Sequence, residues 1–105
     1  MIKTFADRRT RQFFEGRRVA AFTAFADQAR RRLDSLVEAS TLRELQARSG
    51  NRFEALKGDR NGQYSIRVND QWRICFRWEP AAESAPKDPM DIHGNATDVE
   101  IVDYH

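Results

Sequence analysis

Cysteine and histidine are scarce in this chain of 105 residues, which has one cysteine, Cys75, and two histidines, His93 and His105. A single thiol cannot form an internal disulfide, and such cysteine usage fits a reducing compartment. The few candidate ligands also form no metal motif, because His93 has only Asp88 and Asp91 near it in sequence, without a fixed ligand spacing. We therefore expect neither a metal nor another cofactor.

Long apolar runs are also missing, and none approaches the ~20 residues that span a membrane. Residues 1–5 lack the apolar segment of a signal peptide, so we expect a cytoplasmic protein without a membrane partner. The glycines form no phosphate-binding loop, and no Ser/His/Asp spacing indicates a hydrolase triad. Hydrophobic residues make up 40% and charged residues 32% of the chain. These values and the length predict one globular domain, residues 1–105.

The net charge is only +2, but the charges are unevenly distributed. Residues 1–60 contain 14 Lys/Arg and 8 Asp/Glu, a balance of +6, whereas residues 61–105 contain 4 and 8, a balance of −4. Of the 18 basic residues, 15 are arginines. The planar guanidinium binds phosphate through two parallel hydrogen bonds, so an arginine-rich half favours a phosphate-bearing partner. A solvated helix surface explains the same charge equally well.

Apolar residues in the first half recur at the three- and four-residue spacing of amphipathic helices. Asp7 is expected to cap a first helix that ends at Gly16. The clearest helix is expected over residues 22–37. Thr41 and Glu44 form a capping box that begins a short third helix.

After residue 51 the spacing changes to two, which is typical of β-strands. Strands are expected over residues 52–57, 64–68, 72–78 and 98–102, with a short edge strand over residues 2–5. Residues 79–97 contain all three prolines and show no periodicity, which predicts a long surface loop. Helices followed by an antiparallel sheet predict an α+β domain, with the N-terminal helices packed on one face of the C-terminal sheet.

The turn between the two central strands determines which side chains share a face. A three-residue turn at 69–71 pairs Ile66 with Ile74 and Arg67 with Arg73, and it keeps the apolar side chains together. A two-residue turn would place Arg67 opposite Trp72, on the apolar face. Since like charges directly opposite each other are unfavourable, two paired arginines on an open face suggest a bound anion.

The predicted sheet brings a basic stripe near the polar end of the chain. The stripe consists of Lys57, Arg60, Arg67, Arg73 and Arg77, and the end is Asp103-Tyr104-His105. RNA cleavage by the ribose 2′-OH needs a base, an acid and cations that stabilise the charge on phosphorus. Histidine can supply the base or the acid at neutral pH, tyrosine can donate a proton beside cations, and Arg73 suits the phosphorus charge.

Each of these residues also has a structural explanation. A terminal His105 is usually just exposed, Tyr104 can cover the core, and the arginines can form a solvated face paired with Glu100. Trp72 and Trp78 are expected in the core rather than as base-stacking platforms.

Three segments resemble HigB-type toxins of the RelE/ParE superfamily. They are the opening residues 1–5, residues 56–78 with Leu-Lys-Gly-Asp-Arg and Asn-Asp-Gln-Trp-Arg-Ile, and residues 99–105 with the terminal Asp-Tyr-His. The resemblance implies a RelE-like fold and cleavage of mRNA in the ribosomal A site. It also implies a HigA-type helix-turn-helix antitoxin, with operator DNA bound through the toxin–antitoxin complex. The positions that the resemblance implies for catalysis are Lys57, Arg73, Asp103, Tyr104 and His105. Arg60, Arg67 and Arg77 of the basic stripe are expected to contact RNA phosphates, although Arg60 and Arg67 are not direct matches to the family motif.

The chain departs from these relatives in two places. Some relatives have His-Pro just before Leu-Lys-Gly, whereas this chain has Glu54 and Ala55. Either Glu54 takes an acid–base role, or His105 and Tyr104 carry all of it, or activity is weak. The 79–97 loop is also longer than in typical relatives. The alternative functions are a ParE-like, non-enzymatic inhibitor of DNA gyrase and an RNA-binding module that affects ribosome assembly.

Overall fold

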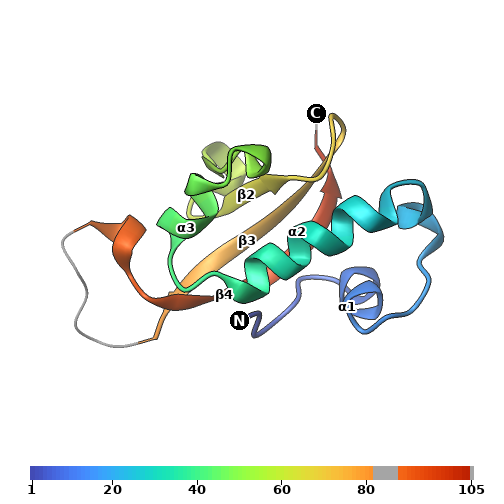
Figure 1. The fold of residues 1–105 in the computed structure, drawn as a ribbon, viewed down its shortest axis with the longest axis horizontal. Helices are drawn as coiled ribbons and strands as arrows, with labels where there is room; N and C mark the ends of the chain where they lie inside the picture. The colour runs from blue at the N-terminus through green and yellow to red at the C-terminus, as the bar shows by residue number, and fades with distance from the viewer. Residues whose placement is uncertain (82–87, 105) are drawn as a thin grey trace.

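The computed structural model describes residues 1–81 and 88–104, and within them the chain forms a four-stranded antiparallel sheet in the order β1-β2-β3-β4. The strands are β1 (Glu54–Ala55), β2 (Tyr64–Arg67), β3 (Trp72–Pro80) and β4 (Gly94–Asp103). The α-helices within the described residues are α1 (Arg8–Phe14), α2 (Ala26–Glu38) and α3 (Leu42–Ala47). Figure 1 shows α2 and α3 in front of the sheet, and α1 packs beside β4. The predicted α+β class is confirmed.

The helix ends form where the sequence supplies capping groups. The Asp7 carboxylate accepts the backbone N–H of Thr10 at 2.9 Å, which begins α1. The capping box of α3 is present, with Glu44 accepting the Thr41 N–H at 2.8 Å. The prediction that the second helix begins near residue 22 is wrong, because a 3₁₀ helix, η1 (Ala20–Phe25), precedes α2.

The register of the central strands is the predicted one, with Ile66 opposite Ile74 and Arg67 opposite Arg73. Between β3 and β4 the register shifts by one residue at Asp98, which has a left-handed backbone with φ of 51°. This β-bulge lets Ala96 and Val99 both face the core, where neither is exposed.

Two predicted strands are much shorter than expected. Strand β1 spans only Glu54–Ala55, because the left-handed backbone of Arg52, with φ of 43°, interrupts the extended run before it. A 3₁₀ helix, η3 (Gly58–Arg60), follows soon after β1. The expected edge strand at residues 2–5 makes only isolated parallel bridges to β4, at Ile2 and Phe5.

The predicted loop over 79–97 is too long at both ends, because β3 continues to Pro80 and β4 begins at Gly94. Gly94 permits this pairing, since a Cβ there would lie 2.4 Å from the carbonyl oxygen of Glu79. Pro80 is tolerated at the end of its strand, where a missing N–H costs little. Residues 82–87 of the predicted loop lie outside the described residues.

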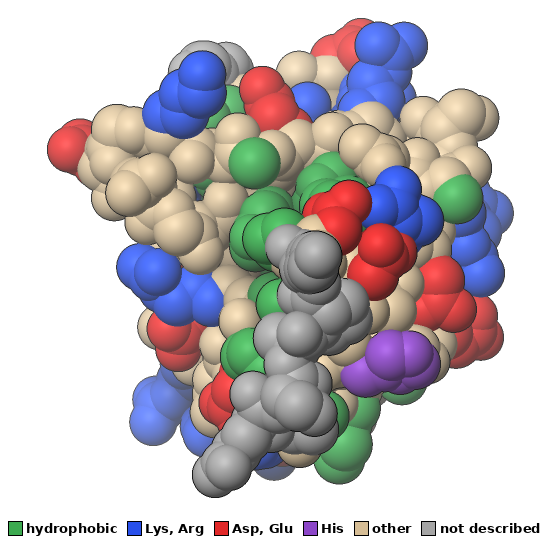
Figure 2. Space-filling model, turned by 90° about the vertical axis from the view of Figure 1, so that its left-hand side faces the viewer, with side chains coloured by type: hydrophobic (Ala, Val, Ile, Leu, Met, Phe, Trp, Pro, Cys, Tyr) green, Lys and Arg blue, Asp and Glu red, His purple; other side chains and the backbone are tan. Residues whose placement is uncertain are grey.

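The extended β3–β4 hairpin is attached to α3 by charged side chains. Arg43 pairs with Asp91 at 2.5 Å and with Asp88 at 2.7 Å. Seen from this end of the molecule, acidic and basic side chains lie beside one another (Figure 2). Exposed pairs of this kind contribute little to stability, so the hairpin is positioned mainly by its strand pairing and its apolar contacts.

The main core lies between the helices and the inner face of the sheet. Its largest fully buried side chains include Phe13, Phe22, Leu36, Ile66, Ile74, Phe76 and Ile101. Burial of each such side chain contributes roughly 1.5–3 kcal/mol to the stability of the fold. Because the inner face supplies this stability, polar side chains can occupy the outer face of the sheet. In the described part of the chain, no helix has the length and apolar character needed to cross a membrane.

Candidate active site

Arg73 lies on the outer face of the sheet, near the beginning of β3. Its Nη1 donates to Ser65 Oγ at 2.6 Å and to the backbone oxygen of Arg52 at 3.4 Å. The same nitrogen lies 3.5 Å from Glu54 Oε2, and the Arg73 side chain is 18% exposed. Within residues 1–81 and 88–104, Nε and Nη2 make no hydrogen bond. One edge of the guanidinium therefore stays available for a second, bidentate partner.

Tyr104 lies against Arg73, directly after β4. The Arg73 guanidinium carbon is 5.8 Å from the centroid of the Tyr104 ring. The ring packs on a small apolar cluster that consists of Leu56, Cys75 and Val102. Burial raises the pKa of the Cys75 thiol, which keeps it protonated and unreactive. The outer face is thus partly covered, whereas we expected it to be open.

Asp103 contacts the β2–β3 turn and begins on the opposite face of the sheet from Arg73, although the sequence places it beside Tyr104. It is opposite Trp72 in the sheet, and because side chains alternate along a strand it begins on the face away from Arg73. Its Oδ2 accepts a hydrogen bond from Gln71 Nε2 at 2.9 Å, and the Tyr104 N–H donates to the Gln71 carbonyl at 2.8 Å. Asp103 therefore attaches the end of β4 to the β2–β3 turn.

The three arginines expected to bind RNA phosphates are each paired with a carboxylate. The pairs are Arg60 with Glu100 at 3.7 Å, Arg67 with Asp70, and Arg77 with Asp98 at 3.6 Å. The side-by-side arginines of β2 and β3 are thus partnered by Asp70 and Glu54, so the protein itself supplies anions there. Lys57 is exposed and has no ion pair within the described residues.

Comparison with known proteins identifies the family. The model of the HigB-like toxin family, described as a RelE-like toxin of the type II toxin-antitoxin system HigB, matches residues 3–93. The chain belongs to this family of toxins. It is 36% identical over 80 residues to "Toxin HigB-1" of Vibrio cholerae serotype O1, covering 74% of this chain and 84% of that one. It is 31% identical over 106 residues to "Endoribonuclease HigB" of Proteus vulgaris, covering 100% of both.

A solved structure, the YoeB-YefM complex from Staphylococcus aureus, matches with 16% identity and a TM-score of 0.49, covering 100% of this chain and 95% of that chain.

Of the residues expected to be catalytic, His105 lies outside the described residues. Arg73 and Tyr104 of the expected catalytic set lie together, with Glu54 beside Arg73. Among residues 1–81 and 88–104, no three His, Cys, Asp or Glu side chains are grouped as metal ligands would be.

Two residues of the site were not singled out from the sequence. Ser65 is fully buried and holds Arg73, and the alternation of β2 places it on the outer face. The predicted register pairs Ser65 with Cys75, which lies two residues from Arg73 on the same face of β3. This pairing could have identified Ser65 as a neighbour of Arg73. Arg52 supplies a backbone carbonyl, which no side-chain pattern indicates.

Proposed function

We propose that this HigB-like toxin is a ribosome-dependent endoribonuclease that cleaves translated mRNA without a metal ion. The observation that carries the proposal is the free edge of the Arg73 guanidinium beside the Tyr104 ring. A relative that aligns along the whole chain is named an endoribonuclease. A guanidinium edge matches two phosphate oxygens, and a phenol beside it is placed to transfer a proton.

In the proposed reaction, the 2′-OH of a ribose attacks the adjacent phosphate. The P–O bond to the 5′ oxygen of the next nucleotide breaks, which leaves a cyclic phosphate and a 5′-OH. Arg73 stabilises the charge on the five-coordinate phosphorus, with Lys57 as a second cation. Tyr104 and His105 transfer the two protons. Glu54 orients Arg73 and is a further acid–base candidate, since relatives with His-Pro have a histidine in this region.

The partners proposed for the chain follow from its family. They are a HigA-type helix-turn-helix antitoxin, the ribosomal A site with its mRNA, and operator DNA reached only through the antitoxin complex. We propose a cytoplasmic location, which these partners would require. Arg60, Arg67 and Arg77 are proposed to contact RNA phosphates after exchanging their carboxylate partners for phosphate.

The test is primer extension on cellular mRNA after brief induction of the toxin. We expect cuts at codon boundaries within translated regions, and we expect none with the Tyr104→Phe or His105→Ala variants. Growth arrest with intact mRNA and trapped gyrase–DNA complexes would instead support the gyrase inhibitor. Growth arrest with intact mRNA and immature ribosomal subunits would support the RNA-binding module.

A further inference from the structure

The arginines of the described chain divide into those with partners and those without. Six arginines have a guanidinium without an ion pair, hydrogen bond or ring contact in residues 1–81 and 88–104, namely Arg8, Arg11, Arg17, Arg18, Arg31 and Arg52. Five of these belong to α1, the segment after it, or α2. Only Arg52, among these six, adjoins Arg73, through the bond from Arg73 Nη1 to the Arg52 carbonyl.

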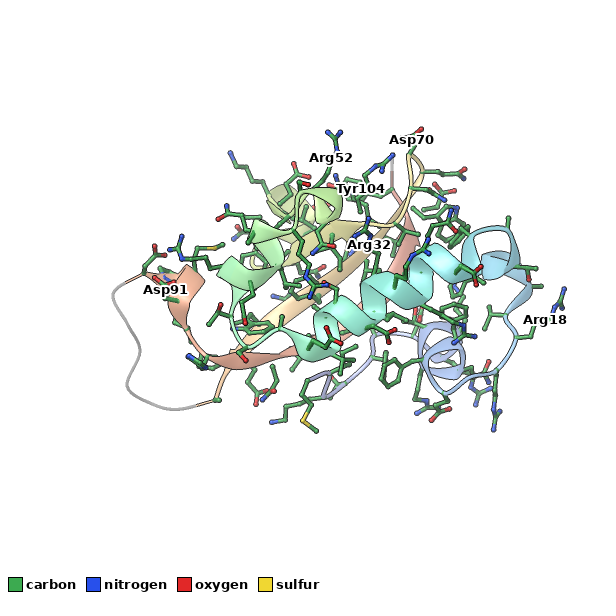
Figure 3. The ribbon with its side chains drawn as sticks, viewed as in Figure 1. Arg18, Arg32, Arg52, Asp70, Asp91 and Tyr104 are labelled. Atoms are coloured by element: carbon green, nitrogen blue, oxygen red, sulfur yellow. The ribbon has the colours of Figure 1, made fainter. Side chains whose placement is uncertain are left out.

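The backbone at Arg52 is held in an unusual conformation. With φ of 43° and ψ of 53° it is left-handed, which L-residues rarely adopt. In this conformation the backbone carbonyl of Arg52 accepts a hydrogen bond from Arg73, and the Arg52 side chain is exposed. In Figure 3 the Arg52 side chain points outward at the upper edge of the molecule, where Tyr104 and Asp70 are also labelled, whereas Arg18 lies at the right-hand end.

The residue before it anchors this conformation. Asn51 is fully buried, and its side-chain amide donates to the Leu45 carbonyl at 3.0 Å and to Ser35 Oγ at 3.4 Å. Its side-chain oxygen accepts a hydrogen bond from Arg32 Nη1 at 3.0 Å. Moving a buried amide away from three hydrogen-bond partners costs free energy. The bonds of Asn51 therefore hold the backbone of the next residue, Arg52, in place.

The surroundings of Arg32, which bonds to the Asn51 side chain next to Arg52, are positively charged. Burial lowers the pKa of Arg32, and the charges of Arg31, Arg67 and Arg48 lower it further. Glu54, the nearest acidic residue in sequence, is directed to Arg73. Within residues 1–81 and 88–104 the Arg52 guanidinium has no partner, whereas Arg60, Arg67 and Arg77 must each release a carboxylate before they bind an anion.

We propose that Arg52 forms a second phosphate-binding subsite, which holds an RNA phosphate next to the one bound by Arg73. The ligand class is a single-stranded polynucleotide, because two adjacent cations with separate functions match consecutive phosphates on one strand. This inference rests on the proposed endoribonuclease function, since it takes Arg73 as the residue at the scissile phosphate. The Arg52 carbonyl orients Arg73, and the Arg52 side chain fixes the register of the strand.

The test compares Arg52→Asn with Arg18→Asn in single-turnover cleavage of a short synthetic mRNA bound to ribosomes. Asparagine tolerates the left-handed backbone, and both substitutions remove one positive charge. Three RNAs are used: unmodified RNA, and RNA with a neutral methylphosphonate on either side of the scissile phosphate. Arg52→Gly, which also accepts this backbone, is used if the asparagine variant has a lower melting temperature.

With the wild-type protein, we expect a methylphosphonate at one of the two positions to slow cleavage about tenfold, which is the usual effect of one charge-assisted contact. Arg52→Asn should cleave unmodified RNA about tenfold more slowly and should be slowed no further by that methylphosphonate. Arg18→Asn should behave as the wild type, and Arg52→Lys should recover part of the rate. This loss of sensitivity to one phosphate distinguishes a contact from general destabilisation.

Two results overturn the inference in different ways. If Arg52→Asn and Arg18→Asn cleave unmodified RNA equally fast, or if the methylphosphonate slows Arg52→Asn as much as the wild type, then Arg52 does not bind that phosphate. If the wild-type protein leaves ribosome-bound mRNA intact, the proposed function fails and the subsite fails with it.

Discussion

The guanidinium of Arg73 faces the ring of Tyr104, with 5.8 Å between the guanidinium carbon and the ring centroid. The two residues lie on β3 and directly after β4, and the Tyr104 N–H is bonded to the Gln71 carbonyl at 2.8 Å. Backbone pairing thus sets the position of both side chains. A cation over an aromatic face is attracted to it, which keeps the phenol beside the group expected to bind phosphate.

Tyr104→Phe tests the hydroxyl of this pair. The ring stays and continues to cover Leu56, Cys75 and Val102, so the melting temperature should not change. Cleavage of ribosome-bound mRNA should fall by about 10² or more, because one proton transfer loses its donor. The matched control is Tyr64→Phe, at a tyrosine that packs on the inner core. Equal rates for the two variants would exclude the Tyr104 hydroxyl from the reaction.

Arg73→Lys separates two properties of the guanidinium, its ability to donate two parallel hydrogen bonds and its positive charge. Lysine keeps the positive charge but cannot bind two phosphate oxygens in parallel, so we expect single-turnover cleavage to slow by about 10²–10³. Arg18→Lys is the control, since Arg18 is an arginine to which the proposed site gives no role. If both lysine variants cleave at the wild-type rate, Arg73 contributes only charge.

Ser65→Ala tests the support of Arg73. The buried Ser65 hydroxyl accepts the 2.6 Å bond from Arg73, and a hydrogen bond to a charged group contributes roughly 1.5–3 kcal/mol. Without it, we expect kcat to fall about tenfold, with a smaller change in KM. Thr10→Val, at another buried hydroxyl, which accepts the Ile101 N–H at 3.0 Å, is expected to lower the melting temperature and leave kcat unchanged. A normal kcat in Ser65→Ala would show that Arg73 is held by its other contacts.

Periodicity was enough to predict the layers and the central register. The pairing of Arg67 with Arg73 followed from one requirement, that the apolar side chains of both strands share a face. The β-bulge at Asp98 could not be predicted, because nothing in the residue type requires a left-handed backbone there. The long β3–β4 hairpin was also missed, since prolines at residues 80–89 suggested a loop while the close approach at Gly94 depends on tertiary packing.

The site was predicted in part. Arg73 and Tyr104 were expected together, and they are. Asp103 was expected with them, but strand alternation turns it to the β2–β3 turn. Arg52 was assigned to a strand, because the bonds of the Asn51 side chain to Arg32 and Ser35, which help to fix the left-handed backbone of Arg52, join residues distant in sequence. The types of the side chains predict which reactions a site can support. The backbone conformation of a residue such as Arg52, by contrast, depends on contacts that form only in the folded core.

The capping box of α3 predicts a pH dependence of stability. Hydrogen bonds from the backbone N–H groups of Thr41 and Ser40 lower the pKa of the Glu44 carboxyl. Because the folded-state pKa is lowered, this contribution to stability is complete above the ordinary pKa of a glutamate and is lost as the pH falls through the lowered value. Glu44→Gln, which keeps the shape without the charge, should therefore be less stable than the wild type at neutral pH.

The measurement is chemical unfolding of both proteins at about pH 7 and about pH 3. The difference in unfolding free energy between the wild type and Glu44→Gln should shrink at the acidic pH. Glu38→Gln is the control, because the exposed Glu38 carboxylate contacts only Arg48, at 3.5 Å, within the described residues. A difference for Glu44→Gln that is the same at both pH values would mean that the ionised carboxylate contributes nothing through the cap. Only its shape would then matter for the beginning of α3.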